Sequence, residues 1–319
     1  MISFIIRRLL QMILVLFGVS IIVFVIVFLL PSDAATMQAG KNQNPERVET
    51  IRHQLGLDQP VYKQYLLFVE RLLHGDLGES YQLQRPVTEM IRENIPNTAQ
   101  LALAAVLIEL IGIPLGIYSA LHQYSFWDTT LTTAALIIWG IPVFVLALGL
   151  QWVFGLKLDL LPITGSGGET FLWVIPADIT NLECLILPAV TLGLIEVAFI
   201  SYMQRASMLE VIRTDYIRTA RAKGLGERSV VLRHALKNAL IPVITIAAID
   251  LGALMGGAIL TETVFSRSGL GLMVYRAIGA RDLPVVAGGV LFITIVFVFA
   301  SLVADILYAI VDPRIRYED

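Results

Sequence analysis

The sequence predicts an all-α membrane protein with six transmembrane helices, and three observations support this prediction. The chain of 319 residues is 56% hydrophobic and only 15% charged, a composition typical of membrane proteins that cross the bilayer several times. Apolar stretches long enough to span a bilayer recur along it. A strongly basic segment, 208–242, separates the fourth stretch from the fifth. This composition excludes a nucleic-acid-binding protein, and the single cysteine, Cys184, excludes an internal disulfide or a cysteine-based metal cluster.

The first membrane helix is predicted within residues 1–30. Arg7 and Arg8 precede the uncharged run 9–30, which at about 1.5 Å rise per residue can span a bilayer core of about 30 Å. A secretory signal would have a shorter apolar core followed by small residues, and the chain around Pro31 has none. We therefore expect a retained helix with its amino end inside the cell.

Residues 31–96 are polar and predict a small extracytoplasmic helical domain. A first helix should begin at Asn44 and Pro45 and end at Gly56, since Asn caps helices and Pro suits the first helical position. A second should run from about residue 60 to Gly75. A third is expected over 87–95, ending before the next proline, Pro96.

The remaining residues, 97–319, predict a membrane core of five further spans. Prolines inside three of these segments should kink or bend the helices that contain them. Three acidic residues fall near the middle of a span. The expected spans are 97–121 with Glu109 and Pro114, 129–154 with Pro142, 184–205 with Pro188 and Glu196, 241–262 with Asp250, and 284–311.

The distribution of basic residues predicts the orientation of these spans. The segments assigned to the cytoplasm carry twelve Lys and Arg residues, including Arg314 and Arg316, whereas the two short outer loops carry four. Short loops rich in Lys and Arg remain on the cytoplasmic side. We therefore expect a multi-pass protein of a prokaryotic cell membrane with both termini in the cytoplasm.

The basic segment itself predicts a helix, a tight turn and a second helix. Leu209, Ile212 and Tyr216 recur at helical spacing, and Gly224 follows where a left-handed C-cap would lie. A second helix is expected to begin near Gly226 and to continue toward the fifth span. In the simplest interpretation, the positive charge of this loop only fixes the orientation of the neighbouring spans.

The order of residues in this loop carries more information than its charge. The stretches YIRTARAKGL at 216–225 and RHALKNALIP at 233–242 resemble the coupling loop of ABC importer permeases. The stretches GDLGES at 75–80, RPVTEMIRENIPNTAQL at 85–101, ETVFSRSGLG at 262–271, RDLPVV at 281–286 and DILYAIVDPRIRY at 305–317 are similar to the dipeptide, oligopeptide and nickel branch of that family.

The resemblance implies the permease subunit of an ATP-driven importer. It implies three kinds of partner: a second homologous permease, two ATP-binding subunits that carry ATP and Mg²⁺, and an extracytoplasmic solute-binding protein. The outer domain either helps to dock the solute-binding protein or only covers the mouth of the pathway. Short peptides are the implied cargo, with nickel chelates, glutathione and oligosaccharides as alternatives. Within the loop 206–240, the residues implied to contact an ATPase are Tyr216, Arg218, Thr219, Ala220, Arg221, Ala222, Lys223, Gly224 and Leu225.

Physical reasoning gives this loop a mechanism. Leu209, Ile212 and Leu225 would anchor it in a cleft of the partner, while its arginines would meet an acidic rim. The chain has no P-loop, metalloprotease motif, nucleophile elbow or paired-cysteine motif. We therefore expect no enzymatic activity, no metal and no cofactor on this chain itself.

Glu109, Glu196 and Asp250 are the candidate pathway residues. An ionisable group inside a span costs about 2.5–3.5 kcal/mol on insertion scales, so each marks a candidate site. They would attract a cationic group such as a peptide amino terminus. Alternatively, they are protonated or bonded to neighbouring hydroxyl groups. Two rival functions remain open. One is an ion-driven secondary transporter that uses these acids as a relay, although the sequence lacks the internal repeat found in many such transporters. The other is a scaffold or receptor whose basic loop recruits a cytoplasmic protein.

Overall fold

The computed structural model describes residues 2–26, 35–36, 44–54, 58–165, 170–171, 175–176, 178–255 and 258–311. These residues are almost entirely helical, as predicted, and their one sheet is an antiparallel pair of two-residue strands. The start of the expected outer domain, and Arg314 and Arg316, lie outside the described residues. The elements are α1 (Ile2–Phe24), α3 (Pro45–Gln54), α4 (Val61–Leu73), α5 (Val87–Glu109), α6 (Gly112–Leu121), α7 (Phe126–Gly140), α8 (Val143–Leu150), η2 (Gln151–Lys157), β1 (Thr170–Phe171), β2 (Ile175–Pro176), α9 (Ile179–Ile212), α10 (Asp215–Ala222), α11 (Glu227–Ser229), η3 (Val230–Ala235), α12 (Leu236–Ala239), α13 (Ile241–Met255), α14 (Ile259–Val264), α15 (Leu270–Gly279) and α16 (Leu283–Val311).

Four described helices are long and apolar enough to cross a membrane by themselves: Ile6–Phe24, Val87–Leu121, Ile179–Ile212 and Leu283–Ile306. Two further spans are possible if each of two bent helix pairs crosses once. One pair is α7 with α8 and η2, and the other is α11 to α12 with α13. The structure therefore has four to six candidate spans.

The expected helix end before Pro96 is wrong. Helix α5 is continuous from Val87 to Glu109 and contains this proline. The chain breaks instead at Leu110 and Ile111, just before the helix that carries Pro114. Pro114 has no N–H to donate to the carbonyl of Leu110. The helical hydrogen-bond pattern is therefore interrupted one turn before Pro114, as expected for a proline inside a helix.

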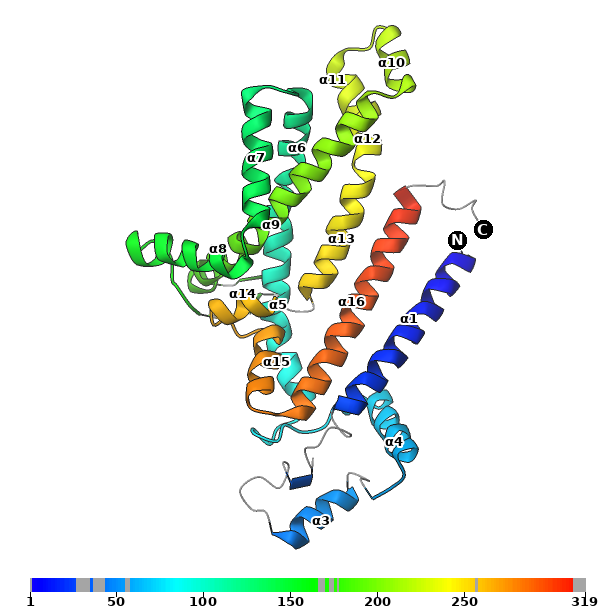
Figure 1. Cartoon of the computed structure of the whole chain (residues 1–319), viewed down its shortest axis with the longest axis vertical. Helices are drawn as coiled ribbons and strands as arrows, with labels where there is room; N and C mark the ends of the chain where they lie inside the picture. Colours follow the sequence, from blue (N-terminus) through cyan, green and yellow to red (C-terminus); the bar gives the residue numbers. More distant parts are fainter. Residues whose placement is uncertain are drawn as a thin grey trace.

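The third span is broken at its proline more sharply than a kinked helix would be. Helix α7 ends at Gly140, and α8 starts at Val143 with the axis turned by 103°. Pro142 lies at this corner, where Ile141 has the extended backbone typical of a residue before proline. Figure 1 shows α8 projecting sideways from the long axis of α7 and α9.

The fourth span is longer than expected. Helix α9 runs for 34 residues through Pro188 and continues into the basic segment as far as Ile212. Leu209 and Ile212 thus belong to the end of a membrane helix, and the loop's own first helix begins only at Asp215. The predicted start of the second helix after Gly226 is confirmed.

Glycines allow the membrane helices to approach closely. A Cβ atom on Gly112 would lie 2.8 Å from the carbonyl oxygen of Val197, and one on Gly116 would lie 2.5 Å from that of Ser201. Gly193 faces the side chain of Ile108 in the same way. Small residues at such interfaces let helices pack backbone to backbone in a membrane. Helices α5, α6 and α9 therefore form one tightly packed unit.

Helices α1 and α16 lie side by side, so the start of α1 is near the end of α16 (Figure 1). Arg8 of α1 forms an ion pair of 2.9 Å with Asp305 near the other end of the molecule's sequence. At the opposite end of α1, Ser20 shares a hydrogen bond of 2.9 Å with Tyr65 of α4. The basic segment lies at one end of the molecule and α3 at the other, with the start of α1 and the end of α16 between them (Figure 1).

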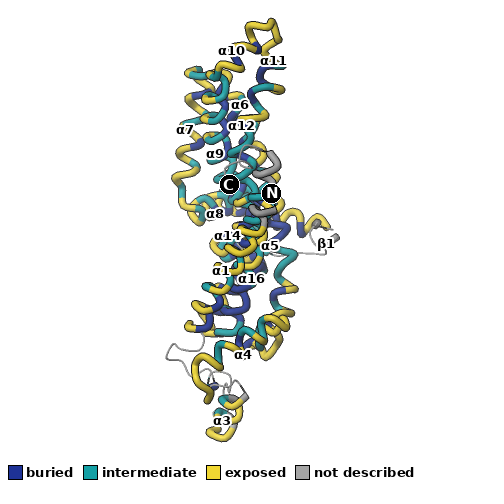
Figure 2. The backbone as a smooth tube through the Cα atoms, turned by 90° about the vertical axis from the view of Figure 1, so that its right-hand side faces the viewer, coloured by how far each residue is buried: buried dark blue, intermediate teal, exposed yellow. Residues whose placement is uncertain are grey.

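The surface of the helices is apolar, as expected where lipid is the solvent. Leu10, Ile13 and Leu14 of α1 are each more than half exposed. Exposed residues cover much of the outline of the molecule in Figure 2, while buried residues are most frequent in α5, α9 and α15. The polar groups of functional interest are buried among these helices or gathered at the two ends.

Candidate functional sites

The basic segment forms a compact helical knob, which we define as α10 to α12, Asp215–Ala239. One face of it is fully apolar: Ile217, Val230 and Ala235 have no exposed surface. These side chains pack in a single cluster with Met208 of α9 and Ala120 of α6. The knob is therefore joined through a hydrophobic core to the ends of two membrane helices.

Gly224 occupies the turn of this knob in the left-handed conformation that the sequence predicts, with φ of +79°. Its amide donates to the carbonyl of Arg221 over 2.9 Å. No atom lies within 4 Å of where a Cβ would be built, so the site has room for a side chain. Backbone conformation, rather than space, is what requires glycine here.

The nine residues expected to contact an ATPase do not all face outward. Eight are exposed, among them Tyr216, Lys223 and Leu225, but Ala220 is buried in the apolar cluster of the knob. The expected anchors Leu209 and Ile212 also pack against this cluster. These three residues therefore stabilise the knob from inside, which the sequence could not show because it does not reveal which face of a helix meets its own chain.

Charged side chains brace the knob from outside. The Arg221 guanidinium binds both carboxylate oxygens of Glu227 over 3.1 and 2.6 Å, which bridges the turn around Gly224. This hydrogen bonding lowers the pKa of the Glu227 carboxyl. Arg218 forms a looser pair of 3.4 Å with Asp215. These pairs hold the turn in place, and the other basic residues of the knob, such as Lys223, keep its exposed surface positively charged.

A buried ion pair fastens α7 to α9 near the knob. Arg205 donates to both oxygens of Asp128, over 2.6 and 2.8 Å, and the Ser119 hydroxyl donates to the same carboxylate. The backbone N–H of Tyr124 supplies a fourth donor at 2.9 Å. Only 4% of the Asp128 side chain is exposed. The sequence signal for this pair was opposite charges at the inner ends of neighbouring spans.

The three membrane acids, Glu109, Glu196 and Asp250, come together between α5, α9 and α13, and we call them the acid cluster. Glu196 and Asp250 lie close enough to interact with each other, and Glu109 lies close enough to interact electrostatically with both. Glu109 is fully buried, and its oxygens accept no hydrogen bond from the described residues.

A second buried polar group, which we call the clasp, joins the middle of α5 to the α14–α15 turn. Glu262 accepts hydrogen bonds from Thr98 Oγ1 at 2.8 Å and from the N–H of Leu272 at 2.9 Å. Arg267, with no exposed surface, donates to Gln100 Oε1 at 2.6 Å. No pattern along the sequence indicates the clasp, because the segments that it joins are more than 160 residues apart.

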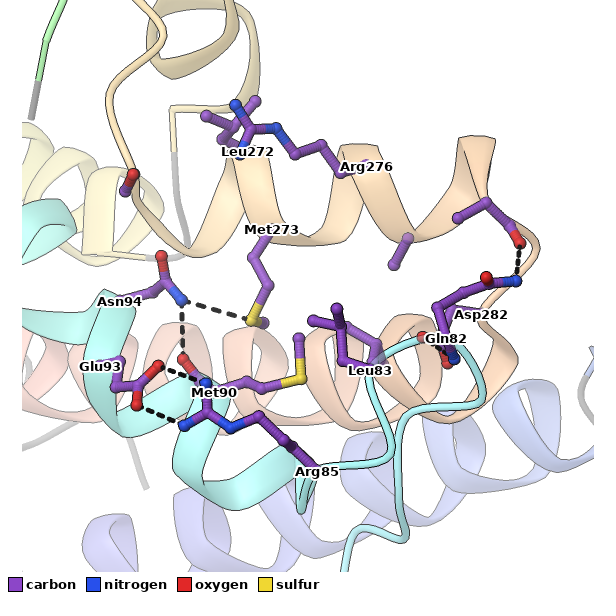
Figure 3. Close-up of a pocket in the computed structure, with 14 residues that line it drawn as sticks. Gln82, Leu83, Arg85, Met90, Glu93, Asn94, Leu272, Met273, Arg276 and Asp282 are labelled. Carbon is purple, nitrogen blue, oxygen red and sulfur yellow. Dashed lines mark hydrogen bonds and ion pairs between the residues drawn. The ribbon is translucent and has the colours of Figure 1, made fainter. Parts of the chain in front are cut away.

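A half-open pocket of about 430 Å³ lies beside the clasp, between the start of α5 and α15. Figure 3 shows its walls, with Arg276 on α15 and Glu93 and Asn94 on α5. Its floor is built by Met90, Met273 and other apolar residues. No group of three His, Cys, Asp or Glu side chains in the described ranges is arranged to hold a metal ion.

The wall of this pocket is fixed by Asp282. This buried carboxylate accepts hydrogen bonds from the Ser80 hydroxyl at 2.5 Å and from the N–H groups of Tyr81 and Gln82 at 3.0 and 3.3 Å. Burial, and secondarily the charge of Asp282, raises the pKa of Tyr81 to about 12. The segment before α5 is therefore tied firmly to the segment after α15.

Comparison with known proteins gives similarity over the whole chain. Residues 112–317 match the family described as the inner membrane component of binding-protein-dependent transport systems, and residues 1–102 match the N-terminal region of such components. The dipeptide transport system permease protein DppB of Alkalihalophilus pseudofirmus is 40% identical, over 99% of this chain and all of that protein. The protein of the same name from Escherichia coli is 37% identical over the full length of both.

A solved structure is similar in fold. The methionine ABC transporter MetNI, in an inward-facing conformation, contains a chain that superimposes with a TM-score of 0.56. The match covers 70% of this chain and 96% of that one, at 18% sequence identity. Because the identity is low, this likeness supports the fold alone.

Proposed function

This chain belongs to the ABC importer permeases of the dipeptide, oligopeptide and nickel family, and we propose that it translocates short peptides across the inner membrane. The observation that carries this proposal is the helical knob, whose apolar core continues into α6 and α9. Full-length relatives named as dipeptide permeases support peptides as the cargo, ahead of nickel chelates, glutathione or oligosaccharides.

The energy for transport comes from partner subunits in this proposal. Two ATP-binding subunits hold ATP and Mg²⁺, and each receives the knob of one permease in a cleft. Tyr216 and Leu225, which are 43% and 40% exposed, supply apolar contact there, and Arg218 and Lys223 meet acidic residues of the partner. This chain contributes binding and motion, and it catalyses no reaction itself.

Movement of the knob would pass to the membrane as a rigid-body rotation. The knob shares its core with Met208 of α9, and Arg205, one turn earlier, holds α7 through Asp128. When the ATPase subunits close, the knob therefore carries α6, α7 and α9 with it. Such motion of one packed unit against another alternates access to a central pathway. A second, homologous permease encloses the other side of that pathway.

The topology that suits this function has six spans with both termini in the cytoplasm. The pair of Arg8 and Asp305 supports it, because it places the first turns of α1 beside the last turns of α16. Each bent helix pair then crosses the membrane once. Helices α3 and α4 form a small domain outside, where a solute-binding protein delivers the peptide.

The acid cluster supplies the pathway with a negative charge in this proposal. Its position between α5, α9 and α13, together with the unpartnered oxygens of Glu109 among the described residues, suits transient attraction of a peptide ammonium group. The rival function, an ion-driven transporter, would use Glu109, Glu196 and Asp250 as a proton relay for coupling. The two functions differ in whether ATP or a proton gradient drives uptake.

Reconstitution separates these functions. The purified permease pair with its ATP-binding subunits is placed in liposomes with the solute-binding protein outside, and entry of labelled alanyl-leucine is followed. Uptake that needs internal ATP, and that persists when an uncoupler removes the proton gradient, supports the proposal. Uptake that follows the proton gradient without ATP would refute it.

A further inference from the structure

We propose that the outer pocket between α5 and α15 is a binding subsite for a short peptide whose two ends are both charged, occupied before the peptide enters the membrane pathway. This inference rests on the proposed function and deepens it, since it assigns a place and a charge pattern to the substrate. The volume of about 430 Å³ falls in the range of pockets that enclose small molecules.

The α15 wall of the pocket carries an available positive charge. Arg276 is exposed, and its guanidinium makes no ion pair or hydrogen bond with any residue that the structure describes. A guanidinium presents a planar fork of donors that matches the two oxygens of a carboxylate. The carboxyl terminus of a peptide is the part of the substrate that fits this wall.

The α5 wall carries the opposite charge. Arg85 binds both carboxylate oxygens of Glu93, over 2.5 and 3.3 Å, and lies 3.5 Å from Glu89, so this group of three retains one net negative charge. Asn94 donates its amide hydrogens to the Met90 carbonyl and the Met273 sulfur, which directs its carbonyl oxygen elsewhere. Figure 3 shows Glu93 and Asn94 on the wall facing α15. This wall suits an ammonium group.

The floor between the two walls is apolar and adaptable. Met90 and Met273 lie there with Leu272 and Val285. Methionine side chains are flexible and polarizable, and they pack against apolar groups of many shapes. A floor of this kind tolerates different peptide side chains, while the charged walls recognise the two ends that all short peptides share.

The frame around the pocket is rigid, which favours binding. Asp282 ties 80–82 to the end of α15, and the clasp holds the beginning of that helix through the N–H of Leu272. A ligand therefore does not have to order the walls when it binds, and it loses less free energy to conformational entropy.

The test measures equilibrium binding of labelled alanyl-leucine to the complete permease complex in nanodiscs, without the solute-binding protein. We expect saturable binding that weakens about tenfold in Arg276→Gln, because one charge-assisted contact is lost. The C-terminal amide of the same dipeptide should bind weakly to the wild type and be insensitive to Arg276→Gln. Ala280→Trp, which adds bulk at the pocket rim, should reduce binding of the free acid.

The matched control is Arg281→Gln, which removes the same charge five residues further along the chain, at an exposed position that does not line the pocket. It should bind alanyl-leucine as the wild type does. An absence of saturable binding, an equal loss in Arg281→Gln, or equal binding of acid and amide would overturn the subsite. If ATP-driven peptide uptake is intact in these cases, only the subsite fails; if the wild type transports no peptide, the proposed function fails with it.

Discussion

At the scale of single residues, Gly224 connects backbone geometry to coupling. Its φ of +79° lies where residues other than glycine are strained by about 1 kcal/mol or more. Because space is open around it, a larger residue would change the path of the chain without a steric clash. Function at this position therefore depends on the direction in which the knob's second half leaves the turn.

Replacing Gly224 with Trp should uncouple the transporter. We expect normal amounts of protein in the membrane but a loss of most ATP-driven uptake. The reason is that the chain would leave the turn in a different direction and the tryptophan would enlarge the surface of the knob. Gly224→Asn is the matched control, since Asn adopts left-handed conformations with less strain; it should retain most uptake. Unchanged uptake in the Trp variant, measured in membrane vesicles, would exclude a coupling role.

The acid cluster makes a separate prediction at this scale. Glu196→Gln should reduce uptake of dipeptides with a free amino terminus more than uptake of their N-acetylated forms, because the lost charge attracts only the ammonium group. Glu183→Gln, an exposed acid on the same helix, is the control and should change neither. An equal effect of Glu196→Gln on both substrates would remove this residue from the pathway.

The buried pair of Asp128 and Arg205 predicts a change in stability. Asp128→Asn leaves Arg205 partly buried without its charge partner, and breaking such a pair costs about 3 kcal/mol. The thermal unfolding midpoint of the detergent-solubilised protein should fall clearly. Asp215→Asn, which breaks an exposed pair with Arg218, should leave the midpoint unchanged. Similar midpoints for the two variants would contradict a stabilising role for the buried pair.

At the scale of elements, the apolar segments were predictable and their bends were not. Long uncharged runs determine α1 and α16 locally, so their spans follow from hydropathy and length. The 103° turn at Pro142 and the continuity of α5 through Pro96 depend on what packs alongside, because proline permits a kink without determining its angle.

The sites were predictable to a similar degree. The turn at Gly224 is a local feature, and its conformation agrees with the prediction. The sequence places Glu109, Glu196 and Asp250 near the middle of their spans, but their meeting depends on how α5, α9 and α13 pack, which the sequence does not show. The clasp required knowing that Thr98 faces Glu262, a contact between distant segments that no spacing along the chain encodes.

The clasp predicts a steric effect within its own element. A Cβ on Gly269 would lie 2.4 Å from the Glu262 carboxylate, so Gly269→Ala should displace the α14–α15 turn and cost about 1–3 kcal/mol. Gly279→Ala is the control at the end of α15, where nothing lies within 4 Å. The thermal unfolding midpoint should be lower for Gly269→Ala than for Gly279→Ala. Equal midpoints would show that the clasp accommodates the added methyl group without loss of stability.

At the scale of the whole molecule, the proposal requires the knob and α4 to lie on opposite sides of the membrane. The one native cysteine, Cys184, is buried, so labelling by a thiol reagent reports on the introduced cysteines. An impermeant maleimide should label Lys63→Cys in intact spheroplasts, whereas it should label Arg218→Cys only after lysis. Labelling of both from outside would contradict the proposed topology.

The central claim is that the knob docks on an ATP-binding subunit, and site-specific photocrosslinking from the knob tests it most directly. A photoreactive amino acid at Leu225 should capture an ATP-binding protein in native membranes, with a yield that changes when ATP is trapped in the complex. The same probe at Lys63 should capture none. If the Leu225 probe captures no ATP-binding protein, or captures it no better than the Lys63 probe, the coupling role of the knob is wrong.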